Sequence, residues 1–232
     1  MEKGLTVRET GNTVVVACRI LEAELKAAMA ETGRDYPVVW MESGLHEQPK
    51  KLTEALKEAL ARTEADYRPD TVLLGYGFCG NALAGIRPGQ YRLILPRIDD
   101  CITMFIGSRE RKRRLENGVG TLFLTEGWLQ NDMDILTLRQ GFIDDYGEED
   151  GLDIFNMMYG NYRRIGLLDC GCCPLAPQAE KSRAIARALG FEHEIYDGSI
   201  DYLKELLTGP WPEERFLVKQ PGQVIETREL QI

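Results

Sequence analysis

The sequence is poor in histidine and in long apolar runs, and its basic residues are outnumbered. It has 2 histidines in 232 residues, and 28 lysines and arginines against 37 acids give a formal net charge of -9. Such an acidic chain is poorly suited to bind nucleic acid or an anionic membrane surface. No stretch approaches the ~18 apolar residues of a membrane span, and the charged start does not resemble a signal peptide. We therefore expect a cytoplasmic protein with no nucleic-acid or membrane partner.

Cysteine, in contrast, is abundant, with 6 residues. Disulfide frameworks stabilise small secreted domains, whereas a chain of this length can bury an apolar core without them. Free thiols often pack in a core as small apolar groups. They can also bind a metal or take part in redox chemistry, and their positions along the chain help to separate these alternatives.

Short β-rich runs alternate with helical stretches along the chain. Strands are expected at 13–17, 37–41, 71–74, 91–95, 121–124, 164–168, 192–196 and 216–219. Helices are expected between most of them, among others at 50–62, 102–115, 126–143 and 180–189. This alternation predicts an α/β fold with a mainly parallel, Rossmann-like doubly wound sheet and helices on both faces.

The chain is expected to form a single α/β domain over residues 1–232. A division into two lobes near 118–120, where glycines interrupt the pattern, is the alternative. The segment 144–153 holds six acids in ten residues and predicts an exposed turn between helices.

Several chemically active side chains follow the carboxyl ends of predicted strands. Cys79, Cys101 and Cys170 each lie just beyond such a strand, and so does His46. In an open parallel sheet the loops after the strands share one edge, and ligands bind in the crevice outside it. The pattern therefore predicts that these thiols and the imidazole converge on one place.

Thiolates and imidazoles are the ligands that zinc and iron–sulfur clusters take in proteins. The unusual Cys170-Gly171-Cys172-Cys173 run strengthens this interpretation. We expect a metal site, either zinc or an iron–sulfur cluster, with the ligands His46, Cys79, Cys101, Cys170 and Cys172. Cys18 is expected to be a core residue.

The turn from Gly75 to Asn81 is rich in glycine and contains Cys79. Glycine lets the backbone approach a ligand closely and offers N–H donors to sulfur or to an anion. We therefore expect cofactor contacts at Gly75, Gly77, Gly80 and Asn81. Gly75, Gly77 and Gly80 have the spacing of the dinucleotide-binding fingerprint, but the sequence that follows leaves little room for the helix that this motif requires.

Several motifs taken together resemble one family. They are Gly75–Asn81, Leu95–Ile102 with Gly107-Ser108, Leu124–Trp128, Gly44-Leu45-His46 with Pro49, and Pro221-Gly222. Over nearly its whole length the sequence is similar to an uncharacterised prokaryotic domain-of-unknown-function family. The resemblance implies members in methanogens and anaerobic bacteria, often encoded near corrinoid-dependent methyltransferases. It implies a role in anaerobic one-carbon or cofactor metabolism, with a corrinoid protein or methyltransferase as partner.

The resemblance also bears on the ligands. His46, Cys79 and Cys101 fall in motifs of that family. The family pattern has His-Asp-Cys where this chain has Asp99-Asp100-Cys101, so a carboxylate replaces one expected ligand. The 170–173 cluster looks particular to this protein or its subgroup.

Three functions are compatible with these residues. The leading hypothesis is a metal-binding protein that serves corrinoid-dependent methyl transfer, the corrinoid being reached through a partner. A metal-free, racemase-like enzyme would instead use Cys79 and Cys172 as paired acid–base thiols. A non-catalytic chaperone that stores or hands over a cofactor is the third, so whether the protein is an enzyme stays open.

Overall fold

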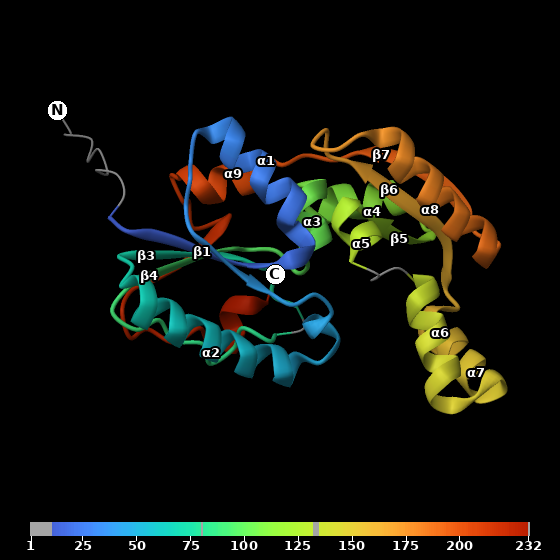
Figure 1. Cartoon of the computed structure of the whole chain (residues 1–232), viewed down its shortest axis with the longest axis horizontal. Helices are drawn as coiled ribbons and strands as arrows, with labels where there is room; N and C mark the ends of the chain where they lie inside the picture. The colour runs from blue at the N-terminus through green and yellow to red at the C-terminus, as the bar shows by residue number, and fades with distance from the viewer. Residues whose placement is uncertain (1–10, 80, 132–134, 232) are drawn as a thin grey trace.

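The computed structural model describes residues 11–79, 81–131 and 135–231 of an α/β protein (Figure 1). The strands are β1 (Thr13–Cys18), β2 (Val38–Met41), β3 (Thr71–Gly75), β4 (Arg92–Pro96), β5 (Gly120–Leu124), β6 (Tyr162–Asp169), β7 (Glu192–Asp197) and β8 (Phe216–Lys219). The α-helices are α1 (Glu22–Thr32), α2 (Pro49–Tyr67), α3 (Cys101–Ile106), α4 (Arg109–Glu116), α5 (Glu126–Gln130), α6 (Ile135–Tyr146), α7 (Glu148–Tyr159), α8 (Leu175–Leu189) and α9 (Asp201–Thr208). Short 3-10 helices are η1 (Arg19–Leu21), η2 (Leu45–Glu47) and η3 (Thr227–Leu230). Within the described ranges, no helix is long and apolar enough to cross a membrane.

The first sheet has the strand order β2-β1-β3-β4-β8. β1 to β4 run parallel, and β8 pairs antiparallel with β4. Every residue of β1 is buried, as expected for an interior strand of a sheet covered on both faces. α1 and α9 cover one face and α2 the other (Figure 1). The chain turns from β1 to β2 on one side and later enters β3 on the other. The crevice between the ends of β1 and β3 is therefore the topological switch point.

A second, wholly parallel sheet has the order β5-β6-β7. β5 begins at Gly120, so the change of sheet coincides with the glycine-rich segment near 118–120. The α/β class, with mostly parallel sheets flanked by helices, is confirmed. The strands that we expected in one sheet nevertheless divide between two, because alternation along the chain does not specify which strands pair.

The end of the chain returns to the first sheet. α9 follows β7 and packs against α1, with Leu203 and Leu206 fully buried. β8 then completes the first sheet, and Lys219 at its end forms an ion pair with Glu229 of η3 at 2.6 Å. The second sheet is thus inserted between elements that belong to the first.

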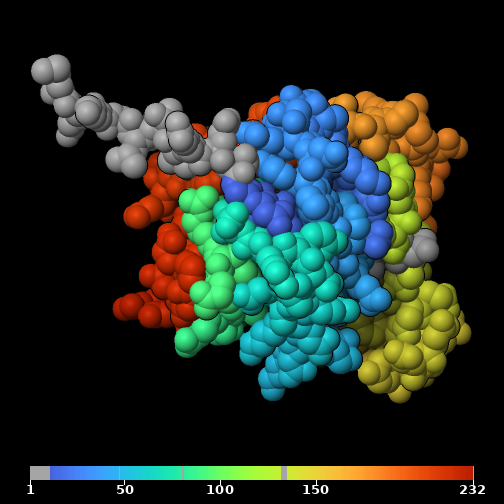
Figure 2. Space-filling model, turned by 60° about the vertical axis from the view of Figure 1, so that its left-hand side comes forward, coloured from blue at the N-terminus to red at the C-terminus, as the bar shows by residue number. Residues whose placement is uncertain are grey.

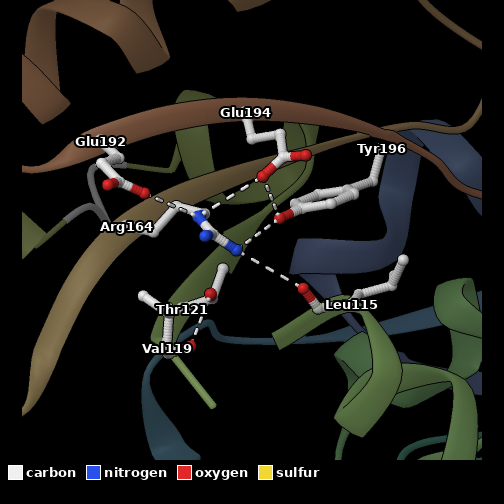
Figure 3. Close-up of polar contacts among 7 residues, drawn as sticks. All are labelled: Leu115, Val119, Thr121, Arg164, Glu192, Glu194 and Tyr196. Carbon is white, nitrogen blue, oxygen red and sulfur yellow. Dashed lines mark hydrogen bonds and ion pairs between the residues drawn. The ribbon is translucent and has the colours of Figure 1, made fainter. Parts of the chain in front are cut away.

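Arg164 of β6 ties the second sheet to the end of α4 (Figure 3). Its guanidinium donates to the Tyr196 hydroxyl at 3.0 Å and to the Leu115 carbonyl at 3.5 Å. It also forms ion pairs with Glu192 and Glu194 of β7 at 3.3 and 3.4 Å. The Arg164 side chain is 13% exposed, whereas those of Glu192 and Glu194 are 70% and 51% exposed, so solvent screens these two ion pairs.

α6 and α7 form a pair that projects from the second sheet (Figures 1 and 2). The acidic segment in which we expected an exposed turn is instead mostly helical. Gly147, with φ of 84°, makes the turn, and Glu148 begins α7. Acids in the first turn of a helix are stabilised by its positive end, which explains why this acidic run continues as a helix.

Candidate functional site

A cavity of about 290 Å³ opens at the switch point of the first sheet and reaches the second sheet. It is lined by the loops after β1, β2, β3 and β4, by α4, and by β5 and α5. The lining residues are Cys18, Ile20, Glu42, Leu45, His46, Tyr76, Cys79, Asp100, Cys101, Ile102, Lys112, Glu116, Thr121, Leu122, Phe123, Trp128 and Tyr162. Of the side chains that were predicted to converge, His46, Cys79 and Cys101 line this one cavity.

The side chains of Cys79 and Cys101 lie beside each other in this cavity. Cys79 lies in the loop after β3 with φ of 43°, and Cys101 is the first residue of α3. The two loops are held together by backbone bonds, from Phe78 N to the Ile98 carbonyl at 2.8 Å and from Cys79 N to the Asp99 carbonyl at 3.0 Å. The sulfur pair is therefore built into the backbone arrangement.

Gly77 allows the loops after β3 and β4 to approach so closely. A Cβ at this position would lie 2.7 Å from the Cα of Asp100, which no ordinary contact tolerates. The backbone of Gly77 also lies beside the Cys101 sulfur and partly offsets the rise in the pKa of that thiol. Gly75 has a different role, because a Cβ there would lie 2.8 Å from the Cβ of Ala17 in β1. These glycines hold the thiol loops in place, which we had not anticipated when assigning them to cofactor contacts.

The thiols of the cavity favour their protonated forms. The neighbouring Cys79 thiol and burial raise the pKa of Cys101 well above its usual value. Burial, with the neighbouring Cys101, raises the pKa of Cys18 to about 12. Lys112 also lines the cavity, but it is bound to the Asp100 carboxylate at 2.5 Å. A bound cation would shift these equilibria toward thiolate, since opposite charge favours the ionised form.

Cys18 and Tyr76 extend the thiol pair toward β1. Cys18, which we had expected to be a core residue, is 5% exposed and yet lines the cavity. The Tyr76 hydroxyl lies beside the Cys18 sulfur and has no hydrogen bond of normal geometry. Burial raises the pKa of Tyr76 far above its usual value, so its proton stays in place at all ordinary pH values.

His46 stands at the rim of the cavity. It is exposed, in η2, and also borders an adjoining apolar groove that contains Trp128, Phe142 and Tyr159. An imidazole here is accessible to solvent and to a ligand entering the cavity.

The cysteines of the 170–173 run lie elsewhere. Cys170, Cys172 and Cys173 follow β6, outside the lining of the cavity, and they neighbour Glu24 of α1. One site that unites Cys79, Cys101, Cys170 and Cys172 is therefore not what the fold assembles. Cys172, the proposed racemase-like partner of Cys79, does not line this cavity either.

Two further cofactor contacts were predicted from the sequence, at Gly80 and Asn81. Asn81 is exposed, with φ of 67°, and does not line the cavity, and Gly80 lies outside the described residues. Across 11–79, 81–131 and 135–231, no three histidine, cysteine or carboxylate side chains already surround one ion position. Cys79 and Cys101 are the two thiols that lie side by side in the cavity.

Tyr76, Lys112 and Trp128 line the cavity, and Glu24 neighbours thiols, although none of these places was predicted from the sequence. Trp128 belongs to a motif that we had noted, so its place in the site had a signal. Lys112 sits in a basic run that is typical of a solvated helix, and Glu24 is an acid in the first turn of a helix. Nothing local distinguishes either from a surface charge.

Residues 40–207 match the model of the family described as "Protein of unknown function (DUF1638)". The chain belongs to the DUF1638 family. The matched part of this DUF1638 protein contains His46, Cys79 and Cys101 as well as the 170–173 run. The resemblance to an uncharacterised domain family is thus confirmed. Neither the curated proteins nor the solved structures gave a match to the chain.

Proposed function

We propose that this DUF1638 protein binds one soft metal ion, zinc in preference to other metals, in the cavity at the switch point. The observation that carries the proposal is the contact between the Cys79 and Cys101 side chains inside a cavity that also holds Cys18 and His46. Zinc takes Cys and His ligands in tetrahedral sites, and catalytic sites keep one position open for substrate. Two neighbouring thiols, with Cys18 and His46 also lining the cavity, supply the kinds of donor that such a site uses.

Zinc suits the donor set better than an iron–sulfur cluster does. A cluster is held by four cysteine thiolates, sometimes with histidines in place of two of them. The cavity is lined by Cys18, Cys79 and Cys101, and the 170–173 thiols stand apart from it. The proposal therefore commits to zinc and treats a coloured iron–sulfur protein as its failure.

The chemistry that zinc would supply is the binding of a substrate thiol as thiolate, the nucleophile that accepts a methyl group. The chain itself would orient that substrate. Trp128 and Phe123 line both the cavity and the adjoining apolar groove, so an apolar part of the substrate can lie across them. Asp100 and Lys112 neutralise each other at the cavity wall and add no net charge.

The wider role that we propose is corrinoid-linked methyl transfer or related one-carbon metabolism in anaerobic prokaryotes. Its support is the resemblance noted above, in which such families accompany corrinoid-dependent methyltransferases, so the partner would be a corrinoid protein or a methyltransferase. We propose that the protein acts in the reducing cytoplasm, where thiols stay reduced. All six cysteines are free, which is compatible with that compartment.

The test is metal analysis of protein purified without oxygen, together with its ultraviolet–visible spectrum. We expect zinc without colour. Cys79→Ser and Cys101→Ser should each lose the zinc of the cavity, because Ser supplies no soft thiolate at neutral pH. Cys173→Ser, a change of the same kind outside the cavity, is the matched control and should retain it.

Iron with sulfide and broad absorption near ~400 nm would contradict the choice of zinc. Undiminished zinc in both Cys79→Ser and Cys101→Ser would overturn the site itself.

A further inference from the structure

Glu24 of α1 is a carboxylate inside the protein. Its relative exposure is 0%, and neither of its oxygens has a hydrogen bond of normal geometry. Burial raises its pKa, and the Thr125 hydroxyl nearby opposes that shift only in part. A buried carboxylate without a partner is costly, so such groups in proteins are paired or bind a metal. Glu24 therefore calls for an explanation that the cavity does not provide.

The groups that face Glu24 are thiols and acids. The charge of Glu24 acts on both Cys170 and Cys172. Burial, and to a smaller extent the charge of Glu24, raises the pKa of Cys172 to about 12. The side chains of Cys172 and Cys173 lie beside each other. Glu126 of α5 lies near Glu24 and Cys173. The cluster thus gathers carboxylates and thiols from three separate segments of the chain.

The backbone places these segments together closely. α5 can approach η1 because Gly127 has no side chain, and a Cβ there would lie 1.7 Å from the carbonyl oxygen of Ile20. This contact brings Thr125 and Glu126 against α1. Gly198 allows a second close approach, because a Cβ at this position would lie only 2.7 Å from the Cys170 sulfur. Both glycines let the cluster form at a junction between the two sheets.

We propose that Glu24, Cys170 and Cys172 form a second binding site for a zinc-class divalent cation, separate from the cavity of Cys79 and Cys101. Zinc takes cysteine sulfur together with carboxylate oxygen, and a cation would neutralise the buried charge of Glu24. The three side chains do not yet surround one ion position, so the thiols of the 170–173 loop must rotate toward Glu24 on binding. Cys173 is not assigned as a ligand, because Pro174 restricts its backbone to extended conformations.

The experiment titrates Zn²⁺ alone into the metal-free full chain under anaerobic conditions, against a chromophoric chelator. Wild-type protein should bind two equivalents. Glu24→Gln keeps the size of the side chain and removes its charge, and it should weaken one equivalent by about tenfold or more. Cys172→Ser, at a half-buried position, should do the same. Glu31→Gln, the same change on the exposed part of α1, is the matched control and should bind as wild type does.

The outcomes separate this site from the cavity. Loss of one equivalent in Glu24→Gln and Cys172→Ser, with a second equivalent that depends on Cys79 and Cys101, supports both sites. If zinc binding depends only on Cys79 and Cys101, the second site is refuted while the proposed function stands. If it depends only on Glu24 and Cys172, the second site stands and the cavity proposal fails. Unchanged zinc binding in folded Glu24→Gln and Cys172→Ser overturns the inference.

Discussion

The side chains of Cys79 and Cys101 lie beside each other although the whole of β4 separates them in the chain. The parallel arrangement of β3 and β4 explains this contact, because it places the loops that follow both strands at one edge of the sheet. Gly77 lets these loops touch, and Asp100 begins the helix that carries Cys101. The geometry of the pair therefore depends on neighbouring residues that are not themselves thiols.

Asp100 is the first such residue to test. Its carboxylate accepts a hydrogen bond from Thr103 N at 2.7 Å, capping α3, and forms the ion pair with Lys112. Although burial opposes it, Lys112 and the cap hold the pKa of Asp100 below its usual value. Asp100→Ala should cost about 1–2 kcal/mol of unfolding free energy and should weaken zinc binding, since it loosens the start of α3 at Cys101.

Ser108→Ala is the matched control for that variant. Ser108 caps α4 by accepting from Arg111 N at 3.1 Å, at an exposed position. It should lower stability by a comparable cap energy of about 1 kcal/mol and leave zinc affinity unchanged. Equal zinc affinity in the two variants would contradict the positioning role of Asp100.

Gly127→Ala should destabilise the protein by about 1–3 kcal/mol in urea unfolding, because the added Cβ would overlap the Ile20 carbonyl and push α5 away from η1. Gly141→Ala is the comparison. Gly141 lies in α6 with no atom within 4 Å of the added Cβ, so this change should stabilise the protein by about 0.5–1 kcal/mol. A tolerated Gly127→Ala would show that the approach of α5 to η1 is not tight.

His193 gives a pH prediction outside both sites. Burial, with the charge of Arg183, lowers its pKa below 6.5, and its Nε2 lies 2.8 Å from the Ser182 hydroxyl. A histidine with a lowered pKa in the folded state binds fewer protons there than in the unfolded chain. Its contribution to stability is thus complete above pH 6.5 and is lost as the pH falls through the lowered value.

His193→Gln should remove that part of the acid sensitivity. Unfolding free energies of wild type and variant, measured from pH 7.5 down to about pH 4.5, should converge as the pH falls. A constant difference between the two curves would contradict the assignment.

The sequence was informative where the signal is local or follows from strand order. Cys79 and Cys101 were predicted to meet because each follows a strand of a parallel sheet, and this holds. The helix expected over 102–115 divides at Gly107, whose φ of 94° ends α3 and allows a new start at Ser108. The glycine was visible, but whether it interrupts or merely weakens a helix is decided by the fold.

Other features depend on contacts between distant segments. Cys170 and Cys172 also follow a strand, and they were expected beside Cys79. β6 belongs to the second sheet, so its loop opens at another place. Glu24 had the pattern of a solvated acid, and it is buried because α5 and the 170–173 loop close over α1. Local periodicity does not predict which strands pair in a sheet or which helices pack against each other.

The central claim is that Cys79 and Cys101 hold one metal ion between them. The most direct measurement is anomalous X-ray diffraction on both sides of the zinc absorption edge, from crystals of zinc-loaded protein grown without oxygen. The account predicts an anomalous peak about 2.3 Å from the sulfurs of both Cys79 and Cys101. Zinc-loaded crystals in which these two sulfurs are clearly seen with no anomalous peak between them would contradict it.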